Sequence, residues 1–138
     1  MALIDRAAWD RHALRDGISV AALGAVPFGV IGRLVVGEDG SRSVLALFTF
    51  LVLIALLMGG AIAAWRQNVG RPLTHGIVTA LVTFAAVQAV GIVRRVVGGD
   101  DIRWGRVVST ALLTLMVGTI GGLVGGFMQS RGARSKLP

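Results

Sequence analysis

The long apolar stretches of this chain contain few side chains able to do chemistry, and Gln88, Arg33 and Pro27 stand out among them. A polar or ionisable group inside a membrane is costly, so each is a candidate functional residue. Pro27 has no backbone N–H and therefore leaves the Leu23 carbonyl without its helical partner. We expect the Gln88 amide to donate a hydrogen bond to that carbonyl; the alternative is that Gln88 lines a polar pathway. Arg33, near the end of its stretch, is expected to reach the interface.

Arrangements typical of catalysis or metal binding do not occur in the sequence. The apolar stretches contain no Asp or Glu, and the chain has no Cys. Its two histidines, His12 and His75, have no acidic or Cys partner at the spacing of metal ligands. His75 begins the third apolar stretch, where a lone His is expected to be an interfacial residue. Because HExxH and Walker sequences are also missing, we predict a protein that is not an enzyme and binds no metal or cofactor.

Four apolar stretches of about 20 residues carry these side chains, and each is long enough to cross a hydrocarbon core of about 30 Å as a helix. The sequence therefore predicts an all-α membrane protein in which residues 1–138 form a single membrane domain. Residues 1–17 and 128–138 are its tails. The predicted transmembrane helices are Ile18–Val36, Val44–Trp65, Thr74–Val93 and Val107–Phe127.

The charged residues favour a lipid surface over nucleic acid as the partner. The net charge is +7, but only 15% of the residues are charged, and the Arg residues flank the apolar stretches. In such positions they meet lipid headgroups and set orientation. With both tails inside, eight Arg and Lys residues lie on the cytoplasmic side and six lie outside. This bias favours an N-in/C-in orientation.

The two halves of the chain match when the sequence is shifted by 62 residues without a gap. Gly59 and Gly60 then fall on Gly121 and Gly122, and Gln67 falls on Gln129. The alignment includes residues of the loops in addition to residues of the apolar stretches. Since each half holds two predicted helices, both halves enter the membrane in the same sense. We predict two tandem-duplicated helical hairpins related by pseudo-two-fold symmetry.

Small residues recur on one face of the fourth stretch and at the end of the second. Helices associate in lipid through close packing of small residues, because lipid tails are as apolar as Leu. The stripes are either the packing faces of the bundle or a self-association face. The candidate helix-packing residues are Thr110, Thr114, Gly118, Gly122 and Gly126, with Gly121 and Gly125 beside them and Gly59 and Gly60 in the second stretch.

Two Gly-rich segments, GGAIAAWRQNVGRPLTHG (Gly59–Gly76) and GGLVGG (Gly121–Gly126), carry a resemblance to known proteins. The chain resembles the uncharacterised small four-span bacterial membrane proteins related to YrzE. That resemblance implies the four-helix fold and the bacterial cytoplasmic (inner) membrane as location. It implies no activity.

These observations predict a non-catalytic small polytopic membrane protein. The first interpretation is an accessory or structural subunit that contacts the lipid bilayer and associates with itself or with a partner membrane protein through its small-residue helix faces. The alternative is a minimal oligomeric transporter or channel for a small solute or ion.

Overall fold

The computed structural model describes residues 9–36, 41–99 and 101–132, and within these ranges it consists of four long helices and no strand. Each helix has 25 to 27 residues, a length of about 38–40 Å that exceeds a hydrocarbon core of about 30 Å. All four are apolar enough to cross a membrane. The predicted all-α membrane fold with four spanning helices is therefore confirmed. The helices are α1 (Arg11–Val36), α2 (Arg42–Arg66), α3 (Pro72–Gly98) and α4 (Trp104–Ser130).

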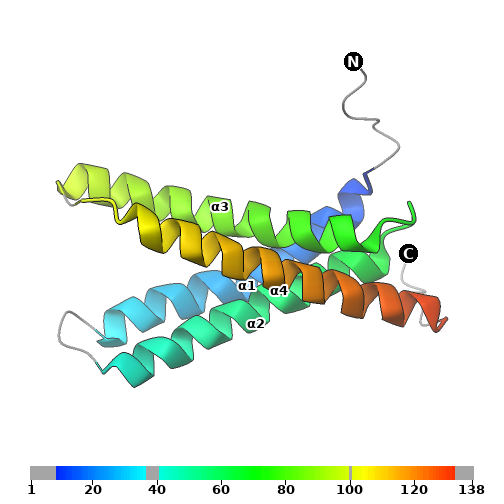
Figure 1. The fold of residues 1–138 in the computed structure, drawn as a ribbon, viewed down its shortest axis with the longest axis horizontal. Helices are drawn as coiled ribbons and strands as arrows, with labels where there is room; N and C mark the ends of the chain where they lie inside the picture. Colours follow the sequence, from blue (N-terminus) through cyan, green and yellow to red (C-terminus); the bar gives the residue numbers. More distant parts are fainter. Residues whose placement is uncertain (1–8, 37–40, 100, 133–138) are drawn as a thin grey trace, which may run out of the picture.

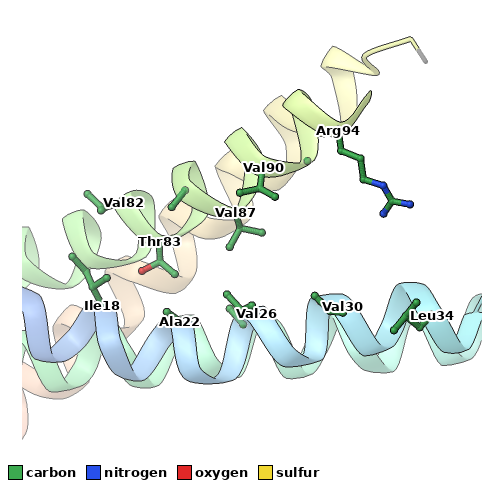
Figure 2. Close-up of a pocket in the computed structure, with 14 residues that line it drawn as sticks. Ile18, Ala22, Val26, Val30, Leu34, Val82, Thr83, Val87, Val90 and Arg94 are labelled. Carbon is green, nitrogen blue, oxygen red and sulfur yellow. The ribbon is translucent and has the colours of Figure 1, made fainter. Parts of the chain in front are cut away.

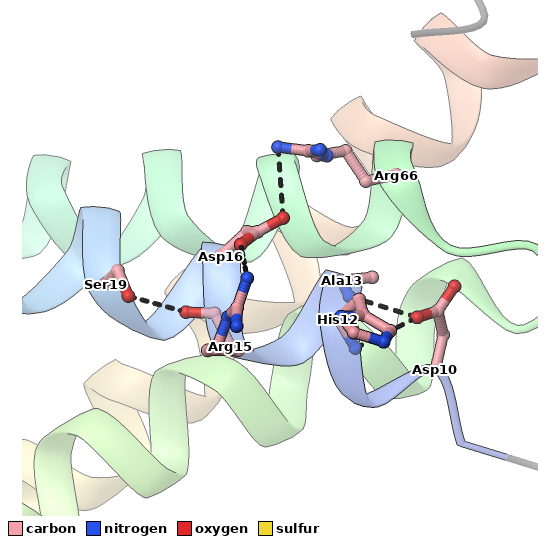
Figure 3. Close-up of polar contacts among 7 residues, drawn as sticks. All are labelled: Asp10, His12, Ala13, Arg15, Asp16, Ser19 and Arg66. Atoms are coloured by element: carbon pink, nitrogen blue, oxygen red, sulfur yellow. Dashed lines mark hydrogen bonds and ion pairs between the residues drawn. The ribbon is translucent and has the colours of Figure 1, made fainter. Parts of the chain in front are cut away.

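The helices extend beyond the apolar stretches, most of all at the start of α1. This helix begins seven residues before the predicted Ile18 because Asp10 caps it. The Asp10 carboxylate oxygen Oδ1 accepts hydrogen bonds from the backbone N–H groups of His12 and Ala13, both at 3.1 Å (Figure 3). A capped first turn satisfies amide groups that would otherwise lack partners. The helix α3 ends at Gly98, because the next residue, Gly99, adopts a left-handed conformation with φ 74°.

The four helices form two hairpins, α1–α2 and α3–α4, that meet at one end and diverge toward the other (Figure 1). We call the end with the α2–α3 turn, residues 67–71, the closed end. The open end contains the last turns of α1 and α3, at Val36 and Gly98. Close approaches between the hairpins, such as those of Gly60 to Gly76 and of Gly121 to Leu57, lie in the closed half. The bundle is therefore joined at one end and splayed at the other.

The arrangement departs from the pseudo-two-fold symmetry that the sequence predicts. α2 contacts each of the other three helices, whereas α1 and α4 make no contact within the described ranges. Under the 62-residue shift, the α1–α4 pair is the counterpart of the α2–α3 pair, which does pack together. The tandem duplication therefore stays a prediction.

The interior of the bundle is built from small side chains, and its surface from large apolar ones. The buried apolar residues are mainly alanines, such as Ala21 and Ala63, while Leu23 and Leu34 are more than three-quarters exposed. Large exposed apolar side chains are costly in water but favourable against lipid tails, so this inverted distribution is typical of membrane helices.

Candidate functional site

His75 is the largest of the fully buried side chains in the described ranges. It lies in the first turn of α3, at the closed end. It is completely buried within the protein, and its place at the membrane interface stays a prediction. Its ring atom Nε2 lies 3.1 Å from the backbone nitrogen of Asp10, and Nδ1 lies 2.9 Å from the Arg71 carbonyl oxygen. A backbone N–H only donates and a carbonyl only accepts, so Nε2 must accept and Nδ1 must donate. Through these two hydrogen bonds, His75 joins the start of α1 to α3.

Gln67 and Gln129 connect the end of α2 to the end of α4. Gln67 is completely buried, and its Nε2 donates to Gln129 Oε1 at 3.0 Å. Gln67 Oε1 accepts hydrogen bonds from the backbone N–H groups of Val69 and Arg71, which hold the α2–α3 turn. In return, Gln129 Nε2 donates to the backbone carbonyl of Gln67 at 2.6 Å. The two amides thus satisfy one another and the turn between the hairpins.

Two aspartates also join separate parts of the chain at the closed end. The Asp10 atom Oδ2 accepts a hydrogen bond from the backbone N–H of Asn68, so the cap of α1 also touches the α2–α3 turn. Asp16 in α1 forms an ion pair with Arg66 at the end of α2, with 3.0 Å between Asp16 Oδ2 and Arg66 Nη1 (Figure 3). We name His75, Gln67, Gln129 and Asp10 the closed-end cluster. Its hydrogen bonds go to backbone groups and to its own members, so it fixes helix ends rather than presenting a reactive group.

The small residues of α4 lie against neighbouring helices of the same chain. Gly118, Gly122 and Gly126 approach α3, and a Cβ atom at Gly122 would lie 2.9 Å from the Leu73 Cα. Gly121 and Gly125 approach α2, where the nearest groups include the Leu57 carbonyl. Close backbone approach of this kind requires residues without side chains.

The remaining candidate packing residues lie in the closed half of the bundle or nearer its open end. Gly59 lies against Gly17 and Ala21 of α1, and Gly60 faces Gly76 of α3. Thr114 is buried, and no hydrogen-bond partner is found for its hydroxyl group. Nearer the open end, the Thr110 hydroxyl donates to the Arg106 carbonyl of its own helix at 2.7 Å.

A cavity of about 430 Å³ lies between α1 and α3, where the two hairpins diverge (Figure 2). Thr83 and Ile18 lie at its narrow end, and Leu34 and Arg94 lie at its wide end. The described side chains of its walls are apolar except for Arg94 and for Thr83, whose hydroxyl group donates to the Thr79 carbonyl. We call this cavity the α1–α3 groove.

The polar residues predicted inside the membrane do not meet. No hydrogen bond joins Gln88 to the Leu23 carbonyl in the part of the chain that the structure describes, and Leu23 is 76% exposed. The hairpins have already separated at this level, and α1 directs Ala22 and Val26, not Leu23, into the groove. Pro27 is exposed within the continuous helix α1. Arg33 belongs to α1, but its side chain is outside the described part of the structure.

Within the described ranges, no group of three His, Asp or Glu side chains lies close enough together to hold a metal ion. The sequence reasoning missed Gln67, Gln129, Asp10 and Arg94 as site residues. For the two glutamines a signal existed, because the 62-residue shift aligns them with each other. Arg94 carried none, since its place at the groove depends on how far the hairpins splay.

Four apolar helices with small residues inside and large ones outside define a multi-pass membrane protein in contact with the lipid bilayer. No family model, curated protein or solved structure matches the chain.

Proposed function

We propose that the protein is a non-catalytic accessory subunit of a bacterial cytoplasmic membrane, with both tails on the cytoplasmic side. This proposal rests on the hydrogen bonds that the buried polar side chains form. In the closed-end cluster, His75 bonds two backbone groups, and Gln67 bonds the α2–α3 turn and Gln129. Side chains whose hydrogen bonds go to the protein's own backbone and side chains stabilise its fold. The proposed relation to the YrzE-like proteins agrees with such a role, since that resemblance implies no activity.

A partner membrane protein would meet large apolar side chains, because the small residues of α4 are already covered by α2 and α3. Exposed aromatic and Met residues gather on α2 and α4: Phe50 and Met58 on the first, and Met116 and Phe127 on the second. Aromatic residues and Met are enriched at protein interfaces, and the flexible Met side chain adapts to different partners. These two helices are therefore the surface that we assign to the partner.

A minimal oligomeric transporter is the second candidate function, and the α1–α3 groove is the observation that favours it. The groove is open at one end and closed at the other, as expected for one state of a carrier. Its walls offer an ion few polar groups, because Thr83 and Arg94 are the polar residues among those that line it. This composition makes the accessory role the better supported of the two.

Native mass spectrometry of tagged protein, extracted gently from its own membranes, separates the two functions. An accessory subunit is expected to leave the membrane in a complex of fixed stoichiometry with a second chain. Phe50→Ala and Met116→Ala should weaken that complex. The control Leu23→Ala removes an even more exposed apolar side chain from α1 and should leave the complex intact. A homo-oligomer without other chains would instead favour the transporter, and a lone monomer would contradict both proposals.

A further inference from the structure

Among the side chains that the structure describes, the α1–α3 groove combines apolar walls with one cation, Arg94, at its wide end. Ala22, Val26 and Val30 of α1 face Val87 and Val90 of α3 across it (Figure 2). Figure 2 shows the Arg94 side chain leaving α3 and pointing into the gap toward α1. An amphipathic molecule with an apolar tail and an anionic head matches this distribution.

Arg94 is available for such a head. Ion pairs in residues 9–36, 41–99 and 101–132 are formed by Arg15 and Arg66, and none of them involves Arg94. Arg94 lies 22 residues after Pro72, so it stands about 33 Å along α3. Since a hydrocarbon core is about 30 Å thick, this level is that of the headgroups when α3 begins at the opposite interface.

We propose that the α1–α3 groove binds one acyl chain of an anionic phospholipid and that Arg94 pairs with the phosphate of its headgroup. The groove runs from Ile18 to Leu34 along α1, which is about 24 Å. One leaflet of the hydrocarbon core is about 15 Å thick, so a chain that enters from the open end fits within this length. This site is separate from the partner surface on α2 and α4.

The lining of the groove matches a lipid chain, because it is apolar along its length and has the Arg94 cation at its wide end. A hydrocarbon chain is only one methylene group wide. The lipid head is recognised by net charge: a guanidinium group pairs with phosphate through two parallel hydrogen bonds, and phosphatidylglycerol lacks the quaternary ammonium group that offsets the phosphate charge in phosphatidylcholine.

Two pairs of variants test the site. Arg94→Gln removes the cation at the groove, and Arg106→Gln removes an exposed cation of α4 that does not line it. Gly29→Leu fills the groove, and Gly105→Leu adds the same side chain outside it. A Cβ atom at either glycine would meet nothing within 4 Å, so the added side chain begins in open space at both positions. Each variant is reconstituted into nanodiscs of phosphatidylglycerol and phosphatidylcholine and released for native mass spectrometry.

The wild-type protein is expected to retain one phosphatidylglycerol molecule in preference to phosphatidylcholine. Arg94→Gln should reduce that preference about tenfold, as expected for the loss of a charge-assisted hydrogen bond. Gly29→Leu should abolish retention of either lipid, and both control variants should behave as wild type. Should Gly29→Leu fail to fold, Val30→Trp fills the same groove from a residue that is 52% exposed.

Two results would overturn the proposal. Equal losses in Arg94→Gln and Arg106→Gln would mean that lipid is attracted by overall charge. Unchanged retention when the groove is filled would place the lipid elsewhere on the protein surface. Neither result depends on whether a partner protein is found.

Discussion

Gln67 and Gln129, which are 62 residues apart, hydrogen-bond to each other through their side-chain amides at 3.0 Å. The same separation aligns the two halves of the sequence, so the bond joins two residues that the predicted repeat makes equivalent. Contact between equivalent residues is expected where a two-fold axis passes. The pair lies at the closed end, where the hairpins meet, while the missing α1–α4 contact breaks the symmetry elsewhere. The most symmetrical interaction is thus also the one that closes the bundle.

Replacing Gln129 by Leu should destabilise the protein by about 1–3 kcal/mol, because it leaves the buried amide of Gln67 without its partner. It also removes the hydrogen bond to the Gln67 carbonyl. Thermal unfolding in a mild detergent measures the effect. The same substitution at Gln88, which has no hydrogen bond among the described residues, is the matched control and should leave the melting temperature unchanged or raise it. Equal destabilisation by the two variants would contradict the assigned role of the cluster.

Replacing Gly76 by Ala should destabilise the α3–α4 hairpin by about 1–3 kcal/mol, the usual cost of overpacking. The added Cβ atom would lie 2.5 Å from the Gly122 Cα and 2.8 Å from the Gly118 carbonyl oxygen, and backbone atoms cannot move aside cheaply. Gly29→Ala is the control, since its Cβ atom would meet nothing within 4 Å. Ala is favoured over Gly in a helix interior, so this control should stabilise the protein by about 0.5–1 kcal/mol. Equal stabilisation by both changes would contradict the close approach of α3 and α4 at Gly76.

Single cysteines should report the orientation cleanly, because the chain contains no Cys of its own. Asn68→Cys lies in the α2–α3 turn and Asp101→Cys lies between α3 and α4, and both positions are exposed. The Arg and Lys bias predicts that an impermeant maleimide labels Asp101→Cys in intact cells. Asn68→Cys should be labelled only after lysis. The reverse pattern would contradict the N-in/C-in orientation.

The four helices could be predicted from the sequence because membrane crossing depends on length and apolar content, which are local properties. The packing of the helices could not, since every face that meets lipid is as apolar as the faces that meet other helices. Leu23 illustrates this. Its carbonyl was expected to face Gln88, but α1 is rotated so that Ala22 and Val26 line the groove.

The closed-end cluster was missed for a related reason. Gln67 and Gln129 follow the ends of the second and fourth apolar stretches, where polar side chains are ordinarily expected to meet headgroups and water. Asp10 lies in the N-terminal tail, and its role as a helix cap depends on α1 beginning seven residues before Ile18. The His75 ring is buried at the closed end, where Trp9 and the Asp10 backbone lie against it. Each of these roles requires two parts of the chain to be placed together, which no local pattern specifies.

The splay of the two hairpins gives the protein a different width in each leaflet of the bilayer. It is narrow where the closed-end cluster joins the helices and broad where α1 and α3 have separated (Figure 1). A body of this shape is a wedge, and a wedge fits best where the leaflet at its broad end is stretched. The same geometry therefore favours a bilayer that curves so that the leaflet at the open end is the convex one.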